Sequence, residues 1–189
     1  MEKVSIGPSN KFCPQTLFLY GTYKEDGTPN FGMFCWVSYY WGDDLGVMAA
    51  ICENKLTRDR IRANGVFSMG LVTEEMLPLA DYFGNNSGYG TTKMDISAAI
   101  EKGRILDVPV LETCPWTFEL EVDKIFADGG VDNYLCKIRN VLADKTLCDE
   151  RLSLEEKLKR IRPVRTVDRT YFSWSGDLIG KWGAPMKNL

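Results

Sequence analysis

The sequence predicts a mainly β protein with helical insertions, folded as an antiparallel β-barrel. Many short runs of strand-like composition are joined by hairpin turns, and helical segments are inserted between some of them. A doubly wound parallel sheet would need regular alternation of strands and helices, which the second half of the chain lacks. A length of 189 residues suits one domain with a full core, so we expect a single domain over residues 1–189, with its core at about 15–175.

Strands and short helices are expected to alternate in the first half of the chain, after a polar N-terminal arm. Asp26-Gly27 marks a hairpin turn between the first two strands. Asn54 is predicted to cap the first helix, and Asn64-Gly65 to end it. The predicted strands are 17–23, 30–40, 46–52 and 66–72, the predicted helices are 55–63, 73–83 and 94–102, and 84–92 is predicted to be a glycine-rich loop.

A long hairpin is expected in the second half of the chain. Apolar residues alternate with polar ones on both sides of the Asp128-Gly129-Gly130 turn, as in two strands that each bury one face. Ser153 and Glu156 have the spacing of a capping box, which predicts the start of a short charged helix. The predicted ranges are strands at 116–127, 133–143 and 165–174, a helix at 153–160 and a loop-like tail at 175–189.

Composition excludes several classes of function. The net charge is −3 and no long basic run is present, so we expect no nucleic-acid partner. No apolar run reaches the ~20 residues needed to cross a bilayer, so we expect no membrane partner. The six cysteines lack the spacing of a zinc site, which predicts free thiols in a reducing compartment, a cytoplasmic location and no metal centre.

The absence of histidine narrows the chemistry further. A chain without histidine has no Ser-His-Asp triad, no histidine general base and no histidine metal ligand. An activity that needs little from the protein's own side chains is therefore favoured, and a bound cofactor that brings its own chemistry is the clearest case. We assign no catalytic residue from the sequence.

Two polar stretches could bind an anion. The first turn of a helix presents unpaired N–H groups, and in NKLTR at 54–58 Lys55 and Arg58 add charge while Thr57 adds a hydroxyl. In the loop GNNSGYGTTK, glycines allow close approach of the backbone, and Ser87 and Lys93 could reach an anion, although the spacing is not that of a P-loop. An ordinary capped surface helix and a mobile loop are the alternatives, and both stay open on these residues alone.

The predicted strand at 30–40 and the residues just after it are rich in aromatic side chains. Trp36, Tyr39, Tyr40 and Trp41 fall within six residues, which is too many for one buried face. Some of them are expected at an interface or in a pocket, although aromatic residues in strands more often fill a core. A flat aromatic ligand that bears a phosphate would suit this strand together with the two polar stretches.

The order of these features resembles that of one known family. An acidic turn leads to Pro29-Asn30 and then to the aromatic strand with Trp36. Asn54-Lys55-x-Thr57 and the segment Ala80-Asp81-Tyr82-Phe83-Gly84 follow in that order. This arrangement is similar to the flavin reductase-like family of FMN-binding split barrels, and to its flavoredoxin-type members in particular, over about residues 15–143, with a weaker similarity at 171–183. The resemblance implies a Greek-key split β-barrel that holds FMN non-covalently near the interface of a homodimer.

The resemblance also implies a set of FMN-binding residues. One group would contact or flank the isoalloxazine ring and the ribityl chain, a second would hold the phosphate at the helix start, and a third would close over it from the loop. In that order the groups are Asn30, Cys35, Trp36, Val37 and Ser38; Asn54, Lys55 and Thr57; and Ser87 and Lys93. Two features depart from the family: YYWGDD at 39–44 stands where Ser-x-x-Pro-Pro is common, and the chain lacks a late histidine that some relatives have.

Three functions stay open at this point. The first is an FMN-dependent NAD(P)H oxidoreductase of the flavin reductase or flavoredoxin type, with NAD(P)H or a small redox protein as electron donor. The second is a non-catalytic FMN-binding electron carrier or sensor. The third is a barrel that binds no flavin and serves as an interaction scaffold.

Overall fold

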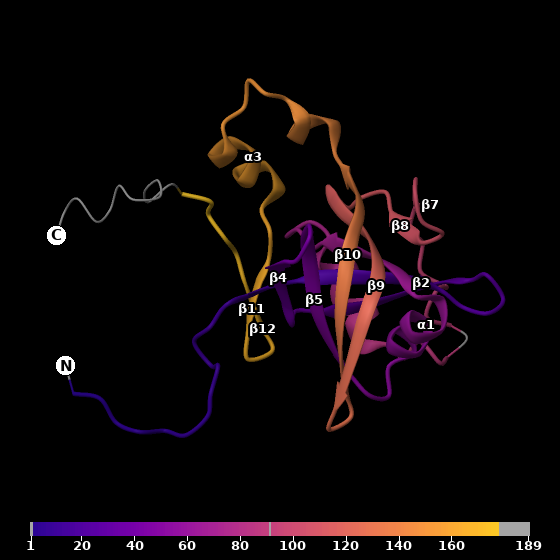
Figure 1. Cartoon of the computed structure of the whole chain (residues 1–189). Coiled ribbons are helices and arrows are strands. Elements are labelled where there is room, and N and C mark those ends of the chain that lie inside the picture. The colour runs from indigo at the N-terminus through magenta and orange to yellow at the C-terminus, as the bar shows by residue number, and fades with distance from the viewer. Residues whose placement is uncertain (1, 91, 178–189) are drawn as a thin grey trace.

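The computed structural model describes residues 2–90 and 92–177, and its main feature is one sheet of seven strands (Figure 1). The strands lie in the order β3-β2-β6-β9-β10-β5-β4, and every neighbouring pair is antiparallel. Their bounds are β2 Phe18–Tyr23, β3 Pro29–Phe34, β4 Val37–Trp41, β5 Leu45–Cys52, β6 Val66–Leu71, β9 Trp116–Asp128 and β10 Val131–Ala143. The prediction of a mainly β, antiparallel fold with helical insertions is confirmed.

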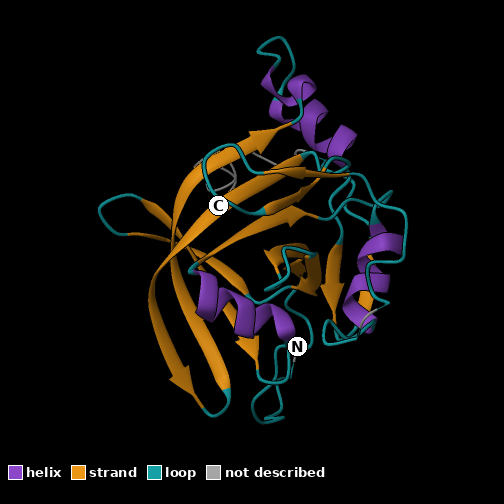
Figure 2. Ribbon diagram, turned by 90° about the vertical axis from the view of Figure 1, so that its right-hand side faces the viewer, coloured by secondary structure: helices purple, strands orange, loops and turns teal. Residues whose placement is uncertain are grey.

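Two smaller sheets and several helices flank the main sheet, whose strands curl around a common centre (Figure 2). One small sheet has the order β1-β11-β12 and joins the two ends of the chain, and the other pairs β7 with β8. The strands of these sheets are β1 Gln15–Thr16, β7 Ile100–Lys102, β8 Pro109–Leu111, β11 Arg165–Val167 and β12 Thr170–Phe172. The helices are α1 Leu56–Asn64, α2 Leu77–Asn85, α3 Leu154–Ile161 and the 3₁₀ helix η1 Lys145–Cys148.

The main hydrophobic core fills the inside of the curled sheet. Alternate side chains of five strands meet there, including the fully buried Tyr20 of β2, Val47 of β5, Phe67 of β6, Leu120 of β9 and Tyr134 of β10. A second cluster lies on the other face of β2 and β3, where α2 covers the sheet. Its members include Leu17, Leu19, Phe31, Ala80 and Phe83.

The aromatic segment predicted as one strand at 30–40 is two strands, so that prediction is wrong. β3 ends at Phe34 and β4 begins at Val37, and the N–H of Val37 donates to the Cys35 carbonyl at 3.1 Å in a tight bend. The bend sends β3 to one edge of the sheet and β4 to the other. It also shifts the alternation of side chains, because Phe34 and Val37 both pack against the barrel core, whereas an unbroken strand would turn them to opposite faces.

The helix predicted at 94–102 is also wrong. Residues 100–102 form β7, which pairs with β8, and the loop that follows is fixed by a buried carboxylate. Glu119 accepts the backbone N–H groups of Arg104, Ile105 and Leu106 at 2.9, 2.9 and 2.6 Å. Strand pairing and this carboxylate, both from outside the predicted helix, override the helical propensity of the two alanines.

Other boundaries shift by a few residues. α2 begins at Leu77 rather than at Thr73, because Thr73 forms a turn in which its Oγ1 accepts the N–H of Met76 at 3.3 Å. The range 165–174 forms the hairpin β11–β12 rather than one strand. The long β9–β10 hairpin, the left-handed Gly65 after α1 and the Ser153 capping box are confirmed. Beyond residue 177, the tail predicted as a loop lies outside the described residues.

All six cysteines are free thiols, as the sequence predicts. In the part of the chain that the structure describes, no helix combines the length and apolar character needed to span a bilayer.

Candidate functional site

Helix α1 begins with amide groups that no side chain caps. Lys55 is the N-cap residue, with extended backbone, and its side chain makes no capping hydrogen bond. The prediction that Asn54 caps this helix is wrong, because Asn54 lies one residue earlier, in a left-handed conformation with φ 60°. The N–H groups of the first turn therefore keep a partial positive charge that a ligand could neutralise.

A pocket of about 200 Å³ lies at this helix start. The start of α1 and the end of β3 form one side, and the end of α2 with the loop after it forms the other. The sequence-predicted residues that line it are Asn54, Lys55, Thr57, Ser87 and Lys93, and Gly32, Asn86, Gly88 and Tyr89 also contribute. Two stretches that the sequence proposed separately as anion sites therefore form one site.

Lys93 is the most unusual side chain of this pocket. Only 5% of its surface is exposed, its Nζ lies 6.0 Å from the centroid of the Phe83 ring, and no carboxylate within the described residues pairs with it. Burial, and then repulsion from Lys55 and Lys24, lowers the pKa of Lys93 to about 8. A buried cation without a counter-ion favours binding of an anion.

Asn30 supports the pocket from behind. Its Nδ2 donates to Thr57 Oγ1 at 3.0 Å and to Thr22 Oγ1 at 3.3 Å. Because Thr57 Oγ1 accepts this bond, the Thr57 hydroxyl proton remains available to a ligand. The Oδ1 of Asn30 is buried without a partner, and a Cβ added to Gly88 would lie 2.6 Å from it. The Asn30 side chain and the loop backbone at Gly88 are therefore closely packed, and Asn30 Oδ1 is left without a hydrogen-bond donor.

Neighbouring contacts hold the walls of the pocket. Arg58, which the sequence suggested as a third cation of the site, does not line it. Its guanidinium instead donates to Asp132 of β10 at 2.8 and 3.1 Å, which ties α1 to the barrel. On the loop, the hydroxyl of Tyr89 donates to Asp59 of α1 at 2.6 Å. These bonds fix the positions of the helix start and the loop relative to each other.

A second cavity, of about 480 Å³, adjoins this pocket, and the two share Met33, Phe34 and Lys55. We call the first the phosphate pocket and the second the ring cavity. The bend between β3 and β4 supplies Cys35 and Trp36 to the ring cavity, and Trp36 is 49% exposed. Further walls come from three other parts of the chain. They are Asn10, Cys13 and Gln15 of the N-terminal arm; Ala50 and Cys52 of β5; and Thr166, Val167, Asp168 and Arg169 of the β11–β12 hairpin.

A polar contact ties the β11–β12 hairpin to α2. The hydroxyl of Tyr171 donates to Asp81 of α2 at 2.6 Å and lies 3.8 Å from the sulfur of Met33. Burial, and then the negative charge of Asp81, raises the pKa of Tyr171 to about 12, so the phenol stays protonated. Burial likewise raises the pKa of Cys35, which keeps a neutral thiol beside the cavity.

A sequence model described as the flavin reductase like domain matches residues 10–161. The chain belongs to the flavin reductase-like family. Solved structures agree with this assignment. The flavoredoxin of Desulfovibrio vulgaris (Miyazaki F) matches with a TM-score of 0.86 and 21% identity, over 97% of this chain and 100% of that one. The flavoredoxin from Methanosarcina acetivorans gives 0.85 and 19%, over 100% and 99%. An FMN-binding protein from Thermus thermophilus gives 0.76 and 17%, over 96% and 98%.

These comparisons confirm the resemblance drawn from the sequence, and the structural matches confirm the split-barrel fold. At such identities structural likeness carries the fold and no more. No curated protein sequence matches the chain. The residues of the flavin reductase-like site therefore have to be argued from the geometry of this chain.

Three of the predicted flavin-site residues do not line the phosphate pocket or the ring cavity. Asn30, which was predicted to contact the ring or the ribityl chain, is buried behind Thr57 and lines neither space. Val37 packs against the barrel core and lines a separate cavity of about 620 Å³ beneath α3. Ser38 is exposed, its Oγ donates to the Tyr39 carbonyl at 3.3 Å, and it lines neither the phosphate pocket nor the ring cavity. For Val37 and Ser38 the bend between β3 and β4 is the reason, because it turns the chain from Val37 onward away from the ring cavity.

Sequence reasoning missed the N-terminal arm and the β11–β12 hairpin as walls of this flavin reductase-like site. Both lie at the ends of the chain, outside the stretch 15–143 that carries the main resemblance, apart from Gln15 itself. The pairing of β1 with β11 brings them together. A Val-x-x-Thr pattern at 167–170 is the only local signal for the hairpin, and it lacks the Asn-Gly of a typical two-residue turn.

Proposed function

We propose that this protein is an FMN-dependent oxidoreductase of the flavin reductase or flavoredoxin type. Bound FMN would supply the redox chemistry, accepting a hydride from a nicotinamide or electrons from a small redox protein and passing them to an acceptor. One observation carries the proposal: a buried lysine without a counter-ion lies in a pocket at an uncapped helix start, and that pocket opens into a cavity beside a half-exposed tryptophan.

The phosphate pocket fits the phosphate of FMN. Lys93 and Lys55 would supply charge, Thr57 a hydroxyl proton and the first turn of α1 backbone N–H groups. Ser87 and Asn54 line the same space, and Asn30 would orient Thr57 from behind. The chemistry of this donor set is that of a dianion site, since every charged side chain that lines it is a lysine.

The ring cavity fits the flat, mostly apolar part of the same ligand. Its lining combines Met33, Phe34 and Trp36 with small residues that leave space, such as Ala50. The neutral thiol of Cys35 adds no charge next to the ring. No side chain of this cavity needs to act as an acid or a base. The task of the protein would be to orient the ring and to exclude water.

The names of the similar structures support FMN as the ligand. One is an FMN-binding protein and two are flavoredoxins, while an NADH:FAD oxidoreductase from Streptomyces globisporus also shares the fold with a TM-score of 0.69. FMN is preferred here because the phosphate pocket lies directly beside the ring cavity and is lined by two lysines, as a terminal phosphate requires.

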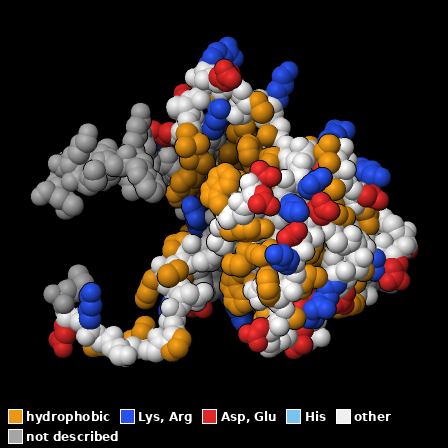
Figure 3. Space-filling model, in the orientation of Figure 1, with side chains coloured by type: hydrophobic (Ala, Val, Ile, Leu, Met, Phe, Trp, Pro, Cys, Tyr) orange, Lys and Arg blue, Asp and Glu red, His pale blue; other side chains and the backbone are white. Residues whose placement is uncertain are grey.

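A homodimer is the assembly that we propose. The side chains of Tyr39, Trp41 and Met48 lie exposed on the neighbouring strands β4 and β5, and Trp41 is 78% exposed. Figure 3 shows apolar side chains gathered over the face between α3 and the barrel. Exposed apolar patches of this kind mark interaction surfaces, and this one includes the YYWGDD segment that departs from the family pattern. Sedimentation equilibrium should give twice the monomer mass of 21.4 kDa.

A non-catalytic FMN-binding electron carrier or sensor is the second candidate. The half-exposed Trp36 favours it, because a ring beside Trp36 would have an edge near solvent, where electrons could pass to another protein without a bound substrate. Turnover separates the two candidates. Steady oxidation of NADH or NADPH with an artificial acceptor supports the enzyme, and tight FMN binding without turnover supports the carrier.

The absorbance spectrum of the purified protein tests the proposal most directly. We expect a yellow protein whose flavin bands bleach under anaerobic conditions when NADH or NADPH is added. Heat-released ligand should be identified as FMN by its phosphate. A colourless protein that takes up no added FMN would refute both flavin candidates and leave the scaffold.

A further inference from the structure

The tip of the β11–β12 hairpin forms part of the ring cavity. Val167 and Thr170 pair across the hairpin, so Asp168 and Arg169 alone make the turn. Both turn residues line the cavity, and both are exposed. The hairpin therefore places Arg169 at the edge of the space that the flavin ring would occupy.

The conformation of this turn is unfavourable for its residues. Asp168 has φ 47° and Arg169 has φ 60°, both in the left-handed region. Two-residue hairpin turns with this geometry favour Asn-Gly, because a Cβ is disfavoured there, above all at the second position. Glycine at position 169 would suit the backbone better, so stability of the turn does not explain the arginine. Such outliers concentrate at functional sites.

The hydrogen bonding of Arg169 also favours a functional role over a structural one. Arg165, on the same hairpin, donates to Thr16 Oγ1 at 3.0 Å and lies 5.3 Å from the ring centroid of Trp174. Arg169 has no such anchor, since no hydrogen bond or ion pair of its side chain is formed within residues 2–90 and 92–177. Its five N–H donors are left for a ligand.

The charge pattern of the two cavities indicates what kind of ligand that is. Lys55 lies at their junction and belongs to both, whereas Arg169 belongs to the ring cavity alone. With the FMN phosphate held at Lys93 and Lys55, Arg169 remains as a separate cation beside the ring. Planar guanidinium groups bind phosphate oxygens in pairs. A second ligand that lies against the ring and bears its own phosphates would meet this side chain.

We infer that Arg169 binds the pyrophosphate of a nicotinamide dinucleotide that donates the hydride, and so selects phosphate-bearing donors over neutral ones. This inference rests on the proposed function. It names the class of electron donor, which the proposal of an FMN oxidoreductase leaves open. Arg169 is then a specificity residue: it holds the part of the donor that does not react.

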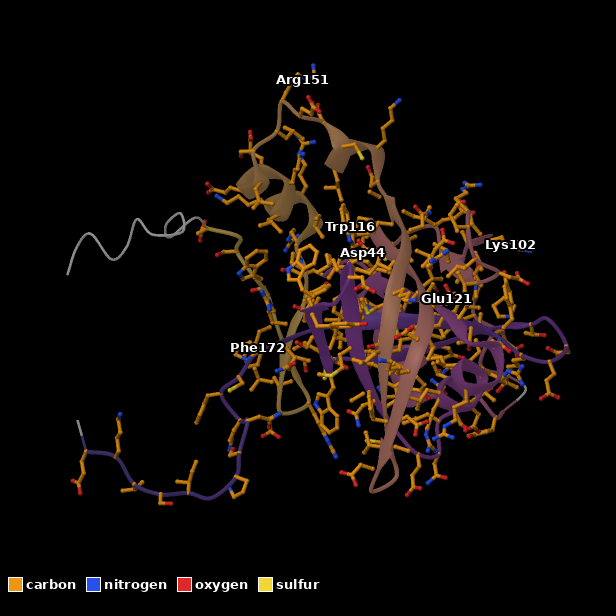
Figure 4. All side chains as sticks on the ribbon, viewed as in Figure 1. Asp44, Lys102, Trp116, Glu121, Arg151 and Phe172 are labelled. Carbon is orange, nitrogen blue, oxygen red and sulfur yellow. The ribbon has the colours of Figure 1, made fainter. Side chains whose placement is uncertain are left out.

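The kinetic test compares donors with and without phosphates on the Arg169→Gln variant. Anaerobic reduction of the holo-protein by NADH and NADPH should become roughly ten- to a hundredfold less efficient, the loss expected for a charge-assisted hydrogen bond. Reduction by 1-benzyl-1,4-dihydronicotinamide, which carries the same reacting ring without phosphate, should be unchanged. Arg151→Gln removes the same charge from the loop before α3, far from the hairpin (Figure 4), and should change neither.

A binding measurement keeps the inference testable apart from turnover. ADP-ribose, which contains the pyrophosphate but no reacting ring, should bind the FMN-loaded wild type and bind Arg169→Gln more weakly by a similar factor. The double change Asp168→Asn with Arg169→Gly should lose the same affinity while raising the melting temperature, because it relaxes the turn.

The outcomes separate the two proposals. Equal losses with the neutral donor, or no loss with NADH, would overturn the role of Arg169 while leaving the oxidoreductase intact. Flavin that neither NADH nor the neutral donor reduces would refute a nicotinamide-dependent oxidoreductase. In that event ADP-ribose still decides: binding that depends on Arg169 supports the anion site, and a wild type that does not bind ADP-ribose refutes it.

Discussion

Two buried charges on opposite sides of helix α1 have opposite surroundings. Asp132 of β10 is completely buried, and Arg58, Arg62 and the hydroxyl of Tyr134 all donate to its carboxylate. Lys93, in the loop after α2, is almost as buried but has no carboxylate partner within the described chain. One charge has its partners inside the protein, and the other does not.

The difference separates a structural charge from a binding charge. The partners of Asp132 hold its pKa well below the ordinary range, so it stays ionised and anchors α1 to the barrel at any physiological pH. The pKa of Lys93 is instead lowered toward neutral pH. The folded protein alone therefore does not stabilise the positive charge of this amine. Helix α1 is thus held in place by Asp132, whose charge is neutralised by Arg58 and Arg62. The N-terminal end of α1 faces Lys93, whose charge has no carboxylate partner within the described residues.

Removing the charge of Asp132 should have the largest effect on stability. Asp132→Asn removes the negative charge that Arg58 and Arg62 share and one of the two oxygens that accept from them, which weakens the link between α1 and β10. Loss of one partner from a buried ion pair costs about 3–5 kcal/mol, and we expect a fall of that size in the free energy of unfolding, measured by urea denaturation.

Asp123→Asn provides the matched control for that prediction. Asp123 pairs with Lys137 on the surface of the β9–β10 hairpin, where such pairs contribute about 0–1 kcal/mol. Equal destabilisation by the two substitutions would contradict the structural role given to Asp132.

Removing the charge of Lys93 should leave the fold intact and weaken the binding of FMN. Met approximates the shape of the lysine stem, so Lys93→Met should not lower the free energy of unfolding of the ligand-free protein. The FMN affinity, measured by fluorescence quenching, should fall by about 1.5–3 kcal/mol because a charge-assisted hydrogen bond to phosphate is lost.

Riboflavin, which lacks the phosphate, supplies the ligand control. Its affinity for Lys93→Met should match its affinity for the wild type. Lys124→Met, an exposed change on β9, should alter neither ligand. A Lys93→Met protein that unfolds, or that loses riboflavin as strongly as FMN, would place Lys93 in the fold rather than in the phosphate pocket.

The contrast also shows why the fold was more predictable than the site. Alternation along β9, the turn at Gly129-Gly130 and the capping box at Ser153 are local patterns, and the structure confirms them. The wrong prediction at 94–102 failed because the partner strand β8 and the carboxylate of Glu119 both lie outside the segment that was read as a helix. Distant contacts leave no periodic trace in the segment that they reshape.

The same limit applied to the site. Lys55, Thr57 and Lys93 could be found because helix starts and glycine loops bind anions for local reasons. Val37 and Ser38 were assigned to the ring through the family resemblance, and the bend at Cys35 turns them elsewhere. Arg169 reaches the ring cavity through tertiary contacts, such as the pairing of β1 with β11 and the bond of Tyr171 to Asp81, which no sequence motif predicts.

The pH dependence of FMN binding gives a finer measure of the difference between the two charges. In the ligand-free protein Lys93 has a pKa of about 8, and a bound phosphate would raise it, because an opposite charge favours the protonated amine. Below pH 8 Lys93 is already charged and the affinity should be constant. Above pH 8 binding requires uptake of a proton, so the affinity should fall by up to about tenfold per pH unit.

Titrations of FMN between pH 7 and 9.5 check this dependence, with proton uptake measured in two buffers of different ionisation enthalpy. Lys93→Met should flatten the profile, and riboflavin should show no fall over the same range. Asp132, whose pKa is held well below its ordinary range, does not titrate here. A fall above pH 8 in wild-type FMN binding that is missing from both controls would therefore belong to Lys93 alone, whereas a flat wild-type profile would show that the phosphate does not meet this amine.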